Sequence, residues 1–249
     1  MNKAYIYIEK FLQGLSDYRH RFVSFDYCYT YFMQHQGNAA SIENISMSCY
    51  ILWSYLASWG MLRGSSQLLQ KNPKFLEGTI AAIDKKSFLY GNQFDYQNYN
   101  NPLIRNQIID GYDAIKESLS EINPSPTLVT KIMLGVYGCV PALDRNFRIA
   151  FSLGQNDLNE NTLIKIYLFK DLNTGSFNCV TYNNPNAYDY QTSKFSKFRY
   201  SNAKMVDMYG FMKGMVIDYL NKHQKLTEYD VLGIMSEGKI NVSLIKDKK

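Results

Sequence analysis

Histidine and cysteine are scarce in this chain, which has three histidines and four cysteines among 249 residues. The cysteines lie far apart without C-x-x-C spacing, and no histidine stands at a metal-ligand spacing. Zinc and iron–sulfur sites need clusters of such ligands, so we expect no metal, and the cysteine usage is that of a reduced, cytoplasmic protein. These residues are Cys28, Cys49, Cys139, Cys179, His20, His35 and His223.

Motifs of nucleotide-dependent and hydrolytic enzymes are also absent. The chain has no P-loop, no G-x-G-x-x-G, no G-x-S-x-G and no H-E-x-x-H. Strands and helices do not alternate in its pattern, which argues against a Rossmann-type enzyme. We therefore expect no cofactor.

Long hydrophobic runs are missing except for one segment. Residues 44–62 carry no charge over 19 residues, which is near the length of a transmembrane helix. Five serine or asparagine side chains interrupt this segment and Arg63 follows it, so we predict a buried helix and no membrane partner. The first ten residues lack the basic and apolar regions of a signal peptide.

The composition is that of a globular protein, with 46% hydrophobic and 20% charged residues. The formal net charge is +5, and 21 tyrosines contribute to an aromatic content of 15%. Tyrosine combines a stacking face with a polar tip, which suits a wet groove as well as a core. Charge and aromatics thus permit nucleic-acid binding, although abundant tyrosine and asparagine are equally typical of an AT-rich genome.

Apolar residues recur at helical spacing along nearly the whole chain, which predicts an all-α fold. Asn72, Asn101 and Ser125 each precede a proline, the form of a capped helix start. Residues 163–169 fit a helix or a strand, and we predict a helix because residues 159–162 provide a cap. Residues 177–200 predict a loop, whose aromatic and basic part, 182–200, suits either a DNA-facing loop or a packed lid.

One segment carries a candidate for catalysis. A fixed carboxylate stabilises the positive charge that develops on a sugar when a glycosidic bond breaks, and it can orient a water. Such a carboxylate works best beside apolar walls, which residues 140–143 can supply. The alternative is that the aspartate only caps the helix that follows it. Residues 130–148 contain an apolar helix, the turn Tyr137-Gly138, the pair Pro141-Ala142, then Asp144, Arg145 and Arg148.

This segment resembles the helix-hairpin-helix DNA glycosylase superfamily, the relatives of endonuclease III and of the alkyladenine glycosylases. The Tyr-Gly turn, the Pro-Ala pair and Asp144 match the pattern of that family in order and nearly in spacing, with Asn146 where the family often has histidine. The resemblance implies that Asp144 is the catalytic carboxylate. It also implies a two-lobed helical fold, with a terminal helical lobe of residues 1–40 and 140–249 and a middle helical lobe of residues 41–139.

Two departures from the family pattern define the expected activity. The glycine-rich hairpin is replaced by residues 123–127, and Thr127 stands near the position of the lysine nucleophile of bifunctional members. Lys131 comes one helical turn later. The resemblance therefore implies a monofunctional DNA base-excision glycosylase, a hydrolase that removes a damaged or modified base flipped out of double-stranded DNA, with phage defence as a candidate role.

Further candidate residues complete the expected site. Aromatic side chains can form a slot for a flipped base, and basic side chains can bind backbone phosphates. The alternatives are core packing for the aromatics and salt bridges for the cations, as for Lys204 and Asp207, which are spaced to pair on the last helix. The candidates are Trp53, Trp59 and Tyr137 for the base pocket, and Arg63, Lys131, Arg145 and Arg148 for DNA binding.

A second resemblance covers more of the chain but implies no function. Residues 55–66, 130–147 and 204–209 are similar to three blocks of a family of uncharacterised bacterial proteins. The alternative function is a non-catalytic helical module that binds nucleic acid or protein within a bacterial defence locus. An RNA-directed toxin or a ligand-binding enzyme is also compatible with the sequence.

Overall fold

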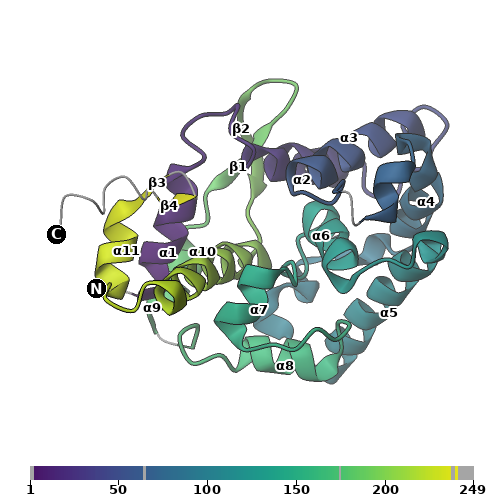
Figure 1. Ribbon diagram of the computed structural model, residues 1–249. Coiled ribbons are helices and arrows are strands. Elements are labelled where there is room, and N and C mark those ends of the chain that lie inside the picture. Colours follow the sequence, from purple (N-terminus) through teal and green to yellow (C-terminus); the bar gives the residue numbers. More distant parts are fainter. Residues whose placement is uncertain (1–2, 64–65, 174, 237–238, 241–249) are drawn as a thin grey trace.

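The computed structural model describes residues 3–63, 66–173, 175–236 and 239–240, and this part of the chain is mostly helical, as predicted (Figure 1). Two small antiparallel hairpins accompany the helices. The helices are α1 (Lys3–Gln13), α2 (Val23–Gln34), α3 (Ile45–Ser58), α4 (Glu77–Lys85), α5 (Pro102–Ser118), α6 (Pro126–Tyr137), α7 (Arg145–Phe151), α8 (Glu160–Tyr167), α9 (Gly175–Tyr182), α10 (Asn202–Lys222) and α11 (Glu228–Ile234). The strands are β1 (Asn186–Asp189), β2 (Lys194–Arg199), β3 (Met235–Ser236) and β4 (Lys239–Ile240).

The predicted caps begin three helical segments. The Asn101 side chain accepts a hydrogen bond from the Leu103 amide at 2.9 Å at the start of α5, and Ser125 accepts one from the Leu128 amide at 3.2 Å at the start of α6. Asn72 caps a single 3₁₀ turn, Pro73–Leu76, that leads directly into α4. Proline at the first helical position removes an amide that would have no partner there, which explains the shared pattern.

Most of the uncharged segment 44–62 forms α3, whose inner face is packed and whose outer face is exposed. Leu52 and Leu56 are completely buried, whereas Met47 and Tyr50 are exposed. The described residues contain no helix with the length and apolar character needed to cross a bilayer. The prediction of a helix is therefore confirmed, and this helix is buried on one face only.

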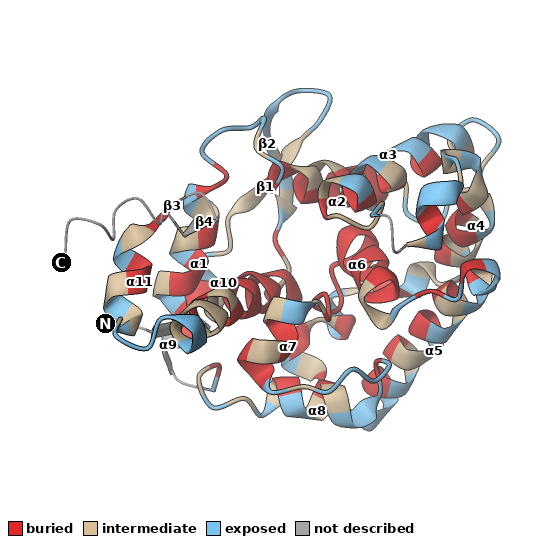
Figure 2. Ribbon diagram, viewed as in Figure 1, coloured by how far each residue is buried: buried red, intermediate tan, exposed pale blue. Residues whose placement is uncertain are grey.

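Helix α6 lies in the middle of the structure and is almost entirely buried (Figure 2). It packs against α2, α3 and α5, while α10 packs against α1, α7 and α11. Helix α2 falls in the predicted terminal lobe by number, yet it packs on α3 and α6 of the predicted middle lobe. The division into two lobes stays a prediction.

The prediction of a loop over residues 177–200 is wrong, because this segment contains most of α9 and the hairpin β1–β2. The hairpin is anchored to α2 by the buried carboxylate of Asp26. The Tyr200 hydroxyl donates to both oxygens of Asp26 at 2.8 and 2.7 Å, and the Tyr188 amide donates at 2.9 Å. These contacts are too distant along the sequence for a local pattern to reveal them.

Burial raises the pKa of Asp26 to about 7, and the hydrogen bonds from Tyr200 and Tyr188 and the charge of Lys204 offset this only in part. In the unfolded chain the carboxyl has its ordinary pKa of 3.8. As the pH rises from about 4 to about 7, the unfolded chain loses this proton first, so the free energy of unfolding decreases over this range.

We predict that Asp26→Asn, which cannot ionise, makes this decrease smaller. Urea denaturation at a series of pH values between 4 and 8 measures it. The matched control is Glu43→Gln on the exposed surface, which should keep the pH dependence of the wild type. Equal pH dependence in Asp26→Asn and the wild type would contradict the role given to this carboxyl.

Candidate functional site

Asp144 is the N-cap of α7, so the capping role that the sequence analysis gave as the alternative to catalysis is confirmed. Its carboxylate accepts a hydrogen bond from the Phe147 amide at 2.9 Å, and its backbone is extended, with φ −79° and ψ 175°. The side chain nevertheless keeps 18% of its surface exposed. The carboxylate therefore caps the helix and also faces open space.

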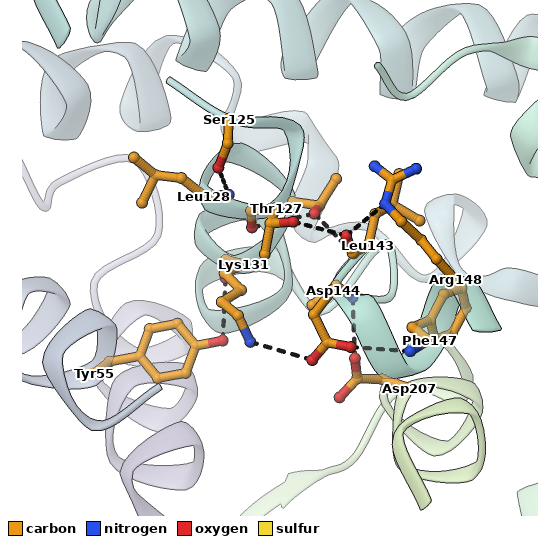
Figure 3. Close-up of polar contacts among 12 residues, drawn as sticks. Tyr55, Ser125, Thr127, Leu128, Lys131, Leu143, Asp144, Phe147, Arg148 and Asp207 are labelled. Carbon is orange, nitrogen blue, oxygen red and sulfur yellow. Dashed lines mark hydrogen bonds and ion pairs between the residues drawn. The ribbon is translucent and has the colours of Figure 1, made fainter. Parts of the chain in front are cut away.

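Helix α6 positions the loop that leads to Asp144 (Figure 3). The Thr127 hydroxyl donates to the Leu143 carbonyl at 2.8 Å, and the Leu143 amide donates to the Thr130 hydroxyl at 2.9 Å. Two side chains of α6, one helical turn apart, thus hold both polar groups of the residue before Asp144. This explains why an aspartate at the end of an irregular loop has a fixed position.

Lys131, also on α6, is the nearest cation to Asp144. Its ammonium lies 3.6 Å from the second carboxylate oxygen, and its side chain is only 5% exposed (Figure 3). The ammonium also lies 4.9 Å from the centre of the Trp59 ring, within the range of a cation–π contact. Asp144 therefore has a hydrogen-bond donor on one oxygen and a cation near the other.

These side chains line a cavity of about 410 Å³, which we call the Asp144 cavity. Arg21 and Arg63 line its wall, and neither has a carboxylate partner among the described residues. Burial, and then repulsion from Arg63, lowers the pKa of the Arg21 guanidinium. These two guanidinium groups, which have no carboxylate partner in the part of the chain that the structure describes, give the cavity an excess of positive charge. The lining residues are Arg21, Trp59, Met61, Arg63, Thr127, Lys131, Asp144, Arg145, Asn146, Phe211 and Met215.

A neighbouring cavity of about 500 Å³ shares Met61, Arg63 and Thr127 with the Asp144 cavity. It lies over the start of α6 and is lined by residues 122–125 of the turn that precedes this helix. The amides of the first turn of a helix attract anions because they have no partner within the helix. Here Ser125 satisfies one of them. We call this space the α6 entry cavity.

Five of the predicted site residues line the Asp144 cavity, namely Asp144, Lys131, Trp59, Arg63 and Arg145. Arg145 is paired with Asp218, at 2.5 Å, so its charge is offset. Trp59 is 8% exposed and stacks on Phe22, with ring centres 5.4 Å apart. It therefore contributes to the wall of the cavity, and Phe22 covers one face of its ring.

Three predicted site residues lie elsewhere. Trp53 is half-buried against the core and does not line the Asp144 cavity. The Tyr137 hydroxyl donates to the Ile83 carbonyl at 2.8 Å at the far end of α6. Arg148 is buried and donates to three backbone carbonyls, those of Leu143, Gly154 and Asn156, so its guanidinium is already occupied.

A buried ion pair supports the Asp144 loop from the opposite side. The Lys204 ammonium lies 2.9 Å from one oxygen of Asp207, and the other oxygen accepts a hydrogen bond from the Ala142 amide at 3.0 Å. Lys204 is 1% exposed, and its ammonium lies 4.2 Å from the ring centre of Phe25. The predicted pairing of Lys204 and Asp207 is confirmed. The pair also holds the loop before Asp144 through the Ala142 amide, which its spacing in the sequence did not reveal.

Within the described residues, no group of three or more histidine, cysteine, aspartate or glutamate side chains can hold a metal ion. Comparisons of the chain with protein families, curated proteins and solved structures found no match. The arrangement of the site itself is therefore the basis for its interpretation.

The cap and the ion pair of Asp144 can be separated by mutation. Asp144→Ala removes both, whereas Asp144→Asn removes the charge and keeps an oxygen for the Phe147 amide. We expect Asp144→Ala to be less stable than Asp144→Asn by about 1 kcal/mol, the usual contribution of an N-cap. Urea denaturation at pH 7 measures this difference, and equal stabilities of the two variants would show that the cap contributes nothing.

Proposed function

We propose that the protein is a monofunctional DNA glycosylase that hydrolyses the N-glycosidic bond of a damaged or modified base. The observation that carries the proposal is the position of Asp144, whose carboxylate faces a cavity with an excess of positive charge. The sequence pattern around Asp144, similar to that of the helix-hairpin-helix glycosylases, supports the same assignment.

The chemistry requires a negative charge close to the sugar. As the bond to the base breaks, the sugar becomes oxocarbenium-like, and a carboxylate held in place stabilises this state without having to reorganise. The Phe147 amide and the loop contacts of Leu143 hold Asp144 in such a position. A small internal space of about 10 Å³ beside Asp144 and Lys131 has room for about one water molecule.

The basic side chains supply affinity for the DNA backbone. Arg21 and Arg63 have no carboxylate partner among the described residues, and Arg63 lines both the Asp144 cavity and the α6 entry cavity. A phosphate at this place relieves the repulsion between the two guanidinium groups, and Arg can bind a phosphate through two hydrogen bonds. Phosphate contacts of this kind position the DNA and carry no sequence information.

The position of Lys131 matters for a second activity, because a lysine that attacks the sugar would let the enzyme also cleave the DNA strand. A lysine that attacks the sugar must lose its proton and reach the reacting carbon, whereas Lys131 is 5% exposed and ion-paired with Asp144. We therefore propose hydrolysis by water alone. Trapping with borohydride, which reduces a Schiff base to a stable bond, should give no covalent complex with DNA.

The activity is tested with duplex oligonucleotides that each carry one damaged or modified base. We expect abasic sites, detected by alkaline cleavage of the labelled strand, on at least one substrate. Asp144→Asn, which keeps the cap, should be at least about 100-fold slower, the usual effect of losing one charge-stabilising group. The control Asp110→Asn removes an exposed carboxylate that pairs with Lys86 and lines neither cavity, so it should keep most of the activity.

Equal rates for Asp144→Asn and the wild type would overturn the catalytic assignment. The absence of abasic sites on every substrate, together with DNA binding that weakens with salt, would support the alternative of a non-catalytic nucleic-acid-binding module. The cap on α7 is the observation that favours this alternative, because it gives Asp144 a structural role.

The proposed phosphate contacts can be tested separately through the salt dependence of DNA binding. In Arg21→Ala/Arg63→Ala, we expect the slope of log K against log salt concentration for duplex binding to become shallower by about 2, since each lost phosphate contact contributes about 0.9. Fluorescence anisotropy with a labelled duplex measures the slope. The double variant Lys165→Ala/Lys170→Ala removes two exposed charges that line neither cavity and should leave the slope at its wild-type value.

A further inference from the structure

Another cavity, of about 490 Å³, lies at the carboxyl end of α6 and shares no lining residue with the Asp144 cavity. Its walls come from α2, residues 89–97, the end of α6, strand β2 and the start of α10. Ligand sites of small molecules have volumes of about 300–1,000 Å³ and combine aromatic walls with a few polar groups. We call this space the tyrosine cavity after Tyr29, Tyr90, Tyr137 and Tyr200, which line it.

The tyrosine rings are buried, and most are held in fixed positions. The Tyr137 hydroxyl donates to the Ile83 carbonyl, and the Tyr200 hydroxyl donates to Asp26. The rings of Tyr90 and Tyr137 meet edge to face, with centres 4.8 Å apart. Rigid aromatic walls suit a planar ring, because a stacked ligand loses water from both faces without ordering the protein further.

One wall residue has an unused polar group. The Tyr90 hydroxyl is buried and has no hydrogen-bond partner among the described residues. Buried polar groups are nearly always paired in native proteins. Asn92 and Gln97, which also line the cavity, are exposed and carry amides that can both donate and accept hydrogen bonds.

The border of the tyrosine cavity is cationic. Lys197 and Arg199 both line it from β2. Both are exposed, and neither has a carboxylate partner among the described residues. Asp95 also lines the cavity, but its two oxygens accept hydrogen bonds from the amides of Asn202 and Ala203 at 2.8 and 2.7 Å.

We propose that the tyrosine cavity binds a nucleoside monophosphate, with the base among the tyrosine rings and the phosphate at Lys197 and Arg199. The aromatic walls match the flat face of a base, the amides of Asn92 and Gln97 match its polar edge, and the paired cations match a phosphate. A free nucleotide and a nucleotide within a strand present the same chemistry. The site is independent of Asp144 and does not require the proposed glycosylase activity.

The experiment is isothermal titration calorimetry at low salt with dAMP, dGMP, dCMP and dTMP, followed by a short single-stranded oligonucleotide. We expect saturable binding with one site per chain for at least one of these probes. Lys197→Ala/Arg199→Ala should weaken this binding at least about tenfold. Both residues are exposed, so a melting temperature near that of the wild type will show that the double variant is folded.

The matched control is Lys194→Ala, which removes an exposed lysine from the same strand but does not line the cavity, and it should keep the wild-type affinity. Binding of a mononucleotide identifies a free nucleotide as the ligand, whereas binding of the oligonucleotide alone, with the same loss in the double variant, identifies a nucleotide within a strand. The proposal is overturned if none of the probes binds at about millimolar concentration, or if binding is unchanged in Lys197→Ala/Arg199→Ala.

Discussion

The ion pair of Lys204 and Asp207 is the interaction on which the geometry of the candidate site depends. Removing two charges from water is costly, and the attraction between them repays this only if the remaining groups are also satisfied. Asp207 meets this condition through the Ala142 amide, and the ammonium of Lys204 lies against the rings of Phe11 and Phe25. The pair therefore fixes helix α10, the aromatic core and the Asp144 loop relative to one another.

Helix α6 explains why three different cavities can coexist in one small fold. It is buried along nearly its whole length, so the groups at its start, middle and end have fixed positions (Figure 2). Its first turn borders the α6 entry cavity, Lys131 in its middle faces Asp144, and Tyr137 at its end lines the tyrosine cavity. Cations that have no carboxylate partner among the described residues border each of these spaces, which gives the positive net charge of the chain a defined location.

The local parts of the fold could be predicted from the sequence, and the long-range parts could not. Caps at Asn101 and Ser125 and the apolar stripes depend on neighbours within one or two turns, so the pattern was sufficient for them. The hairpin β1–β2 was missed because its anchor, Asp26, lies far away in the chain. The same limit applied to the site. Asp144 and Lys131 belong to adjacent elements and were found, whereas Arg21 comes from before α2, and no local signal connects it to Asp144.

Arg148 and Trp59 show a further limit of prediction from sequence. The type of a residue does not reveal which groups its side chain contacts in the fold. Arg148 follows Asp144 closely, but its guanidinium is occupied by backbone carbonyls of the loop after α7. Trp53 and Trp59 are six residues apart, about 240° around a helix, and only Trp59 lines the Asp144 cavity. Helical geometry was sufficient to separate the two tryptophans, but only the structure shows that Phe22 covers one face of Trp59.

The central claim is that Asp144 stabilises positive charge on a sugar, and it can be measured without knowledge of the base that is removed. Two duplexes are compared, one with a cationic pyrrolidine in place of the sugar and one with the neutral tetrahydrofuran analogue of an abasic site. A transition-state mimic should bind about 100-fold more tightly or better than its neutral analogue. We predict this preference for the wild type and its loss in Asp144→Asn, whereas equal affinity of the wild-type protein for the two duplexes would contradict the role given to Asp144.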